Sequence, residues 1–173
     1  MLDLSKLELW FATGSQHLYG AEVLEKVQEH AQEMVRVLSQ SDQIPARIVL
    51  KPVLASADSI VKLCLDANAH SQCIGLLLWM HTFSPARMWI AGVNTLRKPF
   101  AHLHTQYNRS LPWSTIDMDF MDLNQAAHGD REFGFLGARM GLNRKVIAGF
   151  WQDNEVIEEM ATWSRAAAAW HDA

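Results

Sequence analysis

Short apolar runs alternate with longer amphipathic segments along the whole chain. Runs typical of buried strands occupy residues 7–12, 47–51, 74–80, 99–104 and 145–149. Between these runs, apolar side chains recur every three or four residues, which predicts helices over residues 21–39, 56–68, 85–96 and about 117–139, and from 153 onward. Strands that alternate with helices indicate a parallel sheet with helices on both faces, because crossovers between parallel strands are right-handed.

Residues that favour helix starts support this division. Ser56 suits the N-cap of the second helix, Ser84-Pro85 places serine at a cap and proline at the first helical position, and Asp153 precedes the last helix. The predicted fold class is α/β: a flavodoxin-like (Rossmann-like) three-layer sandwich with a five-stranded parallel sheet in the order 2-1-3-4-5. No repeat or second-domain boundary interrupts the pattern, so residues 1–173 are expected to form a single α/β domain. The last helix has no clear stop signal, which suggests a domain of a longer polypeptide.

Composition narrows the classes of protein that fit. The chain has 173 residues, of which 49% are hydrophobic, and a formal net charge of −4 without a long run of either sign. A length and composition of this kind suit a compact domain with a full core. The charge pattern indicates neither a nucleic-acid partner nor a membrane surface.

Cysteine and tryptophan usage adds two expectations. Cys64 and Cys73 are too few for a disulfide framework and are expected to be buried free thiols. Four of the seven tryptophans lie in loops or on the last helix, and some of them are expected to face a partner surface: Trp113, Trp151, Trp163 and Trp170. The chain shows no apolar signal core and no run long enough to cross a bilayer, which predicts a cytoplasmic protein.

Polar side chains follow three of the predicted strands. The segment TGSQHLYG at 13–20 joins the first strand to the first helix, at the sheet edge where α/β proteins bind ligands. The candidate rim comprises Gln16, His17 and Tyr19, then His81, Thr82 and Phe83, then His104, Thr105 and Gln106. No lysine or arginine converges there and no phosphate-loop motif is present, so neutral amides, imidazoles and a phenol favour a polyol or sugar. The alternative is that these are ordinary solvated loop residues.

Other polar positions leave several interpretations open. His102 and His104 alternate along a strand, so they share a face and form either a metal-chelating pair or hydrogen-bonded histidines, the latter favoured because no third ligand has suitable spacing. Gln125 and His128 share one helical face. The run 130–132, Asp-Arg-Glu, is either a solvated charge cluster or an Arg–carboxylate anchor.

Catalytic signatures are missing from the sequence. No acid–base carboxylate pair is expected near the sheet edge, and no Gly-x-Ser-x-Gly motif is present. The chain therefore has the character of a binding surface without its own catalytic pair.

Five long strings closely resemble the N-terminal domain of the bacterial L-arabinose isomerase family. They are WFATGSQHLYG at 10–20, WMHTFSPARMW at 79–89, HLHTQYNR at 102–109, IDMDFM at 116–121 and NQAAHGDREFG at 124–134. The resemblance implies an aldose–ketose isomerase that converts L-arabinose to L-ribulose, and D-galactose to D-tagatose, through a metal-assisted enediol. The family uses a divalent metal, usually manganese, and a glutamate pair.

In the family, the glutamates and the metal ligands lie in later domains, so the resemblance assigns this chain neither catalytic residues nor metal ligands. It also implies a hexamer in which a neighbouring subunit's N-terminal domain completes each active site. The residues that it implies as sugar contacts are Gln16, Leu18, Tyr19, Phe83, Gln125 and His128. It leaves His17, His81 and Gln106 with supporting or structural roles.

Two further hypotheses remain at this stage. One is a catalytically silent sugar-binding or interaction module. The other is a flavodoxin-like nucleotide binder, which is suggested by architecture alone, and the first loop has no hydroxyl-rich phosphate cradle for it.

Overall fold

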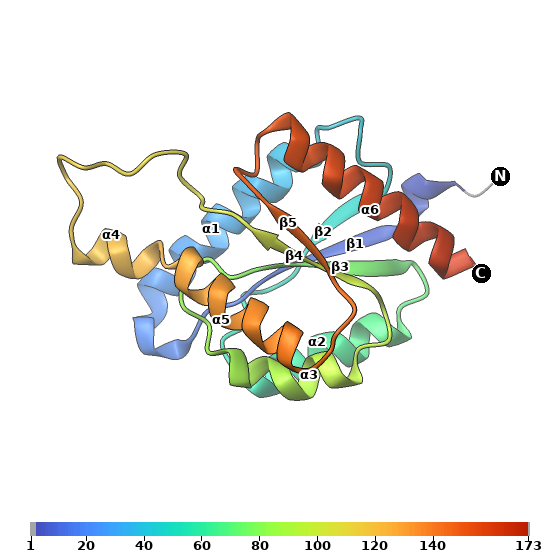
Figure 1. The fold of residues 1–173 in the computed structure, drawn as a ribbon, viewed down its shortest axis with the longest axis horizontal. Coiled ribbons are helices and arrows are strands. Elements are labelled where there is room, and N and C mark those ends of the chain that lie inside the picture. Colours follow the sequence, from blue (N-terminus) through green and yellow to red (C-terminus); the bar gives the residue numbers. More distant parts are fainter. Residues whose placement is uncertain (1–2, 173) are drawn as a thin grey trace.

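The computed structural model describes residues 3–172 and contains one five-stranded parallel sheet (Figure 1). Its strands are β1 (Glu8–Thr13), β2 (Arg47–Leu50), β3 (Cys73–Trp79), β4 (Phe100–His104) and β5 (Lys145–Ala148). Every neighbouring pair is parallel, and the order is β2-β1-β3-β4-β5. The predicted fold class and strand order are confirmed.

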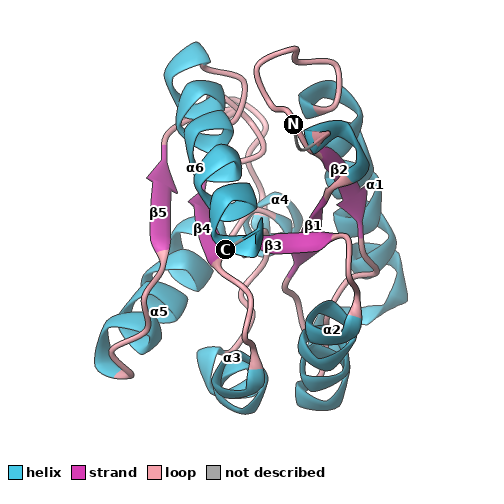
Figure 2. Ribbon diagram, turned by 90° about the vertical axis from the view of Figure 1, so that its right-hand side faces the viewer, coloured by secondary structure: helices cyan, strands magenta, loops and turns pink. Residues whose placement is uncertain are grey.

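Helices cover both faces of the sheet, as Figure 2 shows. They are α1 (Gly20–Leu38), α2 (Ala57–Ala69), α3 (Ile90–Thr95), α4 (Met118–Leu123), α5 (Ala126–Arg139) and α6 (Asn154–Asp172). Three single 3₁₀ turns accompany them: η1 (Leu4–Lys6), η2 (His17–Tyr19) and η3 (Ala86–Trp89). Within residues 3–172, no helix is both long and apolar enough to cross a lipid bilayer.

The core has two layers because successive side chains of a strand point to opposite faces. Leu9 and Phe11 of β1 pack with buried side chains of α1 and α6. Trp10 and Ala12 pack instead with α2, η3 and α5. All seven residues of β3 are buried, as expected of a central parallel strand that is covered on both sides.

Helix starts agree with the sequence at one site and differ at another. Ser56 forms the predicted cap of α2, together with Ser59 in a reciprocal capping box. The predicted cap at Ser84 is wrong. Its hydroxyl accepts a hydrogen bond from the Trp89 indole at 3.0 Å, and the backbone of Pro85 is not helical, so the helical turn starts at Ala86.

A carboxylate from a distant helix replaces the expected cap. The backbone N–H of Ala86 donates to Glu132 of α5 at 2.7 Å. Glu132 therefore belongs neither to a solvated cluster nor to an Arg–carboxylate anchor. A tertiary contact of this kind has no signature in the local sequence.

The helix predicted over 117–139 is divided into α4 and α5. Asp117 caps α4 by accepting from the Phe120 N–H at 2.8 Å, and the helix ends at Asn124, whose backbone leaves the helical region. The Asn124 amide donates back to the Phe120 carbonyl at 2.9 Å, which satisfies a group at the helix end. The break lets α4 lie apart from α5 (Figure 1).

Gly129 allows α5 to approach the loop after β3 closely. A Cβ added there would lie 2.8 Å from the Thr82 carbonyl oxygen and 3.0 Å from Met80 Cβ. A backbone oxygen in a packed loop cannot move away without disturbing its neighbours. The first turn of α5 is therefore held against the segment that follows β3.

Gly129→Ala is expected to lower the free energy of unfolding by about 1–3 kcal/mol, because the added methyl group overpacks this contact. Gly134→Ala on the same helix is the matched control, since its added Cβ would meet only His102 Cε1, at 3.9 Å. The control gains helix propensity and is expected to be neutral or stabilising by up to about 1 kcal/mol. Urea denaturation of both variants measures the difference, and equal stabilities would contradict the packing argument.

Candidate functional site

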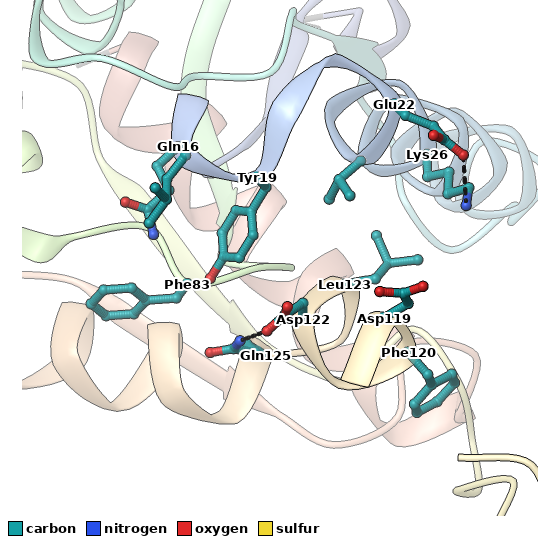
Figure 3. A pocket seen from close by; sticks show the side chains of 12 residues that line it. Gln16, Tyr19, Glu22, Lys26, Phe83, Asp119, Phe120, Asp122, Leu123 and Gln125 are labelled. Carbon is teal, nitrogen blue, oxygen red and sulfur yellow. Dashed lines mark hydrogen bonds and ion pairs between the residues drawn. The ribbon is translucent and has the colours of Figure 1, made fainter. Parts of the chain in front are cut away.

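A cavity of about 770 Å³ opens at the carboxyl ends of β1 and β3, where the strand order reverses (Figure 3). Its wall combines the loop after β1, the start of α1, the loop after β3, α4 and the residue before α5. The lining residues are Gln16, Leu18, Tyr19, Glu22, Val23, Lys26, Phe83, Asp119, Phe120, Asp122, Leu123 and Gln125. Parallel α/β sheets bind ligands at this position, so the cavity is the candidate site.

Most of the residues implied as sugar contacts meet at this cavity. Those in its lining are Gln16, Leu18, Tyr19, Phe83 and Gln125. His128 is outside the lining, but its ring stacks on Phe83 with centroids 4.4 Å apart and an interplanar angle of 23°. Three segments far apart in the sequence thus supply one continuous group of side chains.

The loops after β1 and β3 are bonded to one another. Thr82 Oγ1 donates to Ser15 Oγ at 2.7 Å, and both side chains are fully buried. Ser15 also donates its N–H to the Leu54 carbonyl at 3.0 Å. Gly20 starts α1 with a φ of +82°, a conformation that favours glycine. These constraints fix the short η2 turn that carries Tyr19.

Tyr19 presents its phenol to the cavity as a neutral group. Burial raises the pKa of Tyr19, and the negative charge of Asp122 acts in the same direction. Hydrogen bonding from Gln16 and from the backbone of Phe83 opposes the shift. The hydroxyl therefore keeps its proton at neutral pH and can donate to a ligand oxygen.

Charged side chains also line the cavity, which corrects the expectation that no cation converges there. Lys26 of α1 lies in the wall and pairs with Glu22 at 3.5 Å. Asp119 and Asp122 come from α4, so acids outnumber bases three to one. The sequence does not indicate these residues as cavity residues, because periodicity gives a helical face but not the element that this face contacts.

Three members of the predicted rim from the loops after β1 and β3 lie outside the cavity lining: His17, His81 and Thr82, which bonds to Ser15. His17 is exposed and not part of the lining, whereas His81 is fully buried. The His81 ring faces His30, with Nε2 and Nδ1 2.6 Å apart, and stacks on Trp79. Burial lowers the pKa of His81 to about 3. This geometry gives His81 a place in the core.

The third predicted loop lines a different cavity. His104, Thr105 and Gln106 border a space of about 480 Å³ at the ends of β4 and β5. The expectation of one rim made from three loops is therefore wrong. Only the loops after β1 and β3 meet at the candidate site, because β4 lies one strand further from the point where the order reverses.

His102 and His104 share a face of β4, as their alternation predicted. Their rings are parallel within 3° and have centroids 5.7 Å apart. Asp130 of α5 faces both histidines. Its Oδ1 lies 2.6 Å from His102 Nε2 and its Oδ2 lies 3.6 Å from His104 Nε2. Both earlier interpretations of Asp130 are wrong, because it is a buried partner of histidine.

Burial determines the protonation of this group. It raises the pKa of Asp130 to about 8 and lowers the pKa of His102 to about 4. At pH 7 both are thus neutral, and the protonated carboxyl donates to Nε2 of His102. In the part of the chain from 3 to 172, no group of three or more histidine, cysteine or acidic side chains has a geometry that holds a metal ion.

Fold and cavity together define an α/β domain with a candidate ligand site at the topological switch point. A model of the L-arabinose isomerase N-terminal domain matches residues 3–173. The L-arabinose isomerase of Koribacter versatilis is 67% identical to this chain over 173 residues, and that of Herpetosiphon aurantiacus is 65% identical over 173 residues. Both matches cover 100% of this chain, but only 35% and 34% of the respective relatives. That of Geobacillus stearothermophilus is 57% identical over 169 residues, 98% of the chain and 34% of that protein.

The chain belongs to the family of L-arabinose isomerase N-terminal domains. The resemblance identified from the sequence strings is confirmed. The chain spans about a third of the length of the curated relatives it matches.

The Asp130–His102 pair predicts a pH dependence of stability. The folded state keeps the Asp130 proton up to its pKa of about 8, whereas an ordinary aspartate loses it near 3.8. The pKa of His102 is lowered from its ordinary 6.5 to about 4, so between these two pH values only the unfolded state holds that proton. The contributions of the two residues to the free energy of unfolding therefore cancel up to pH 6.5. From pH 6.5 to 8 only the folded state holds the proton, and the pair's contribution falls by about 2 kcal/mol as pH rises.

Asp130→Asn is expected to abolish this fall, because the amide does not titrate. Urea denaturation at half-unit steps from pH 6.5 to 8 measures the slope. Asp42→Asn, at an exposed site, is the control and should keep the wild-type slope. An unchanged slope in the Asp130 variant would show that other groups cause the pH dependence.

Proposed function

We propose that this chain is the sugar-contacting N-terminal domain of an L-arabinose isomerase, acting on L-arabinose and on D-galactose. One observation carries the proposal: residues from three separate segments of a family member's chain gather at a single switch-point cavity. The proposed contacts are Gln16, Leu18, Tyr19, Phe83 and Gln125, with His128 supporting Phe83.

The chemistry of the wall suits a neutral polyhydroxy ligand. Gln16 and Gln125 offer amides and Tyr19 offers a phenol, all of which exchange hydrogen bonds with hydroxyl groups. Phe83 and Leu18 give apolar surface for the C–H face of a sugar. The excess of acidic over basic side chains disfavours phosphorylated sugars, because their charge would be repelled.

Two exposed apolar side chains support a shared site. Leu18 is 84% exposed and Trp113, on the loop before α4, is 78% exposed. We propose that these surfaces meet a neighbouring subunit of a homo-oligomer, hexameric in the family. Of the four tryptophans expected to face a partner, Trp113 and Trp170 are exposed, Trp163 is half-buried against the core and Trp151 is buried, so the proposed interface uses the first two.

The family's divalent metal, expected to be manganese, does not fit the described residues. His102 Nε2, the best-placed donor, is occupied by Asp130, and no suitable group of three ligands exists in residues 3–172. We therefore assign the metal ligands and the glutamate pair that moves the proton to polypeptide outside this chain. The domain's own task is to hold the sugar.

The isolated 173-residue chain is expected to show no isomerase activity. An assay with L-arabinose and manganese, scored by ketose formation, tests this against the complete polypeptide that carries the chain. Turnover by the isolated chain would contradict the assignment of catalysis to other domains. Binding of L-arabinose without turnover even by the complete polypeptide would favour the alternative, a catalytically silent sugar-binding module.

Tyr19→Phe in the complete polypeptide is expected to lower kcat/KM for L-arabinose about tenfold, since it removes one ligand hydrogen bond of roughly 1.4 kcal/mol. Tyr107→Phe is the matched control: Tyr107 is the chain's other tyrosine, stacks on His30 and is not part of the cavity lining. It should change kcat/KM less than about twofold. Equal effects of the two substitutions would remove Tyr19 from the proposed contacts.

A further inference from the structure

A hydrogen bond between two cavity residues connects α4 to the start of α5. Asp122 Oδ1 accepts from Gln125 Nε2 at 3.0 Å, and both side chains line the cavity (Figure 3). The residues lie on either side of the break at Asn124, so this contact spans the junction of the two helices.

The bond determines which end of the Gln125 amide faces a ligand. A carboxylate only accepts hydrogen bonds, so the amide must turn its NH₂ group toward Asp122. The carbonyl Oε1 then points away from Asp122, as Figure 3 shows. Gln125 therefore presents an acceptor, and a sugar hydroxyl that meets it must donate.

No hydrogen bond to the described residues of its own helix holds the Gln125 side chain. It occupies the N-cap position of α5 but makes no side-chain cap bond, unlike Asp117 at the start of α4. Among the described residues, Asp122 is its hydrogen-bond partner. Without that partner, the amide would be free to rotate and to exchange its donor and acceptor ends.

Asp122 influences the opposite wall in a complementary way. Burial raises the pKa of Tyr19 above its ordinary 10.0, and the charge of Asp122 adds to this shift, so the phenol is a donor at neutral pH. The cavity thereby offers an acceptor at Gln125 and a donor at Tyr19. A ligand hydroxyl can accept from one and donate to the other.

We propose that Asp122 is a positioning residue for the sugar pocket: it orients the Gln125 amide so that its oxygen accepts from a ligand hydroxyl. The inference rests on the proposed function for its kinetic consequence, and on the geometry of α4 and α5 for the orientation itself. Asp122 need not touch the sugar to act in this way.

Three variants separate the possible roles of Asp122. Asp122→Ala removes the acceptor, Asp122→Asn keeps an acceptor oxygen without the charge, and Asp119→Asn removes a charge from the same helix without removing the partner of Gln125. In the complete polypeptide, Asp122→Ala is expected to raise KM for L-arabinose about tenfold, whereas Asp122→Asn stays within about threefold of the wild type. Equal losses in both Asp122 variants would overturn the positioning role.

The side-chain amide signal of Gln125 provides a readout that needs no sugar. In ¹⁵N-glutamine-labelled chain, with the signal assigned by its loss in Gln125→Glu, the amide protons are expected to shift in Asp122→Ala. They should remain near their wild-type positions in Asp122→Asn and Asp119→Asn. An unmoved signal in Asp122→Ala would refute the inference.

The two readouts distinguish failure of this inference from failure of the proposed function. If the wild-type complete polypeptide isomerises no sugar, the proposed function fails, and the amide signal still decides the orientation of Gln125. If the enzyme is active and the Asp122→Ala amide and KM both match the wild type, only the positioning role fails.

Discussion

The parallel pairing of β1 with β3 determines where the first two loops of the candidate site lie. Residues Leu9 to Thr13 pair in register with Gly75 to Trp79, so the two strands end level with each other. The chain leaves β1 toward α1 on one face and leaves β3 toward α3 on the other. The two exits diverge, and the space between them is the cavity. The buried bond between Thr82 and Ser15 keeps these two loops together.

The opposite wall depends on how α5 is held. Gly129 brings the helix against the loop after β3, Glu132 caps the turn at Ala86, and Asp130 bonds to His102 of β4. These three contacts lie within one turn of the helix and face three different neighbours. The start of α5 is thus fixed relative to both β3 and β4. This also fixes the position of Gln125, which is the N-cap residue of the helix. The contacts that hold α5 against the core therefore also place the one cavity residue at its N-cap.

Much of the fold could be predicted because its signals are local or periodic. The continuous apolar run 74–80 indicated a central strand, and the stripe on 21–39 indicated a helix that covers one face. The site residues on loops were predictable for the same reason, since they directly follow strands. The buried state of Asp130 was not predictable, because it results from a contact with His102 of a distant strand. The break before α5 and the bond between Ser84 and Trp89 are local, but periodicity and cap preference do not reveal which side chain a polar group will bond to. Lys26 was missed likewise, since its place depends on how α1 packs beside α4.

The protonation states of the described residues support the proposal that this domain binds the sugar and that other domains carry out the catalysis. Moving a proton between adjacent sugar carbons requires a base whose pKa lies near the working pH and which reaches the substrate. In residues 3–172, the carboxyl with a pKa raised toward neutrality is Asp130, but it is 1% exposed and bonded to His102. His81 and His102 are buried. Burial lowers their pKa values to about 3 and 4 and separates both rings from the cavity. Gln16, Tyr19 and Gln125 bring neutral hydrogen-bonding groups to the cavity, beside the charged side chains of Glu22, Lys26, Asp119 and Asp122. Neutral amides and a phenol suit the orientation of a sugar, which supports the proposal that the reacting groups belong to another part of the assembly.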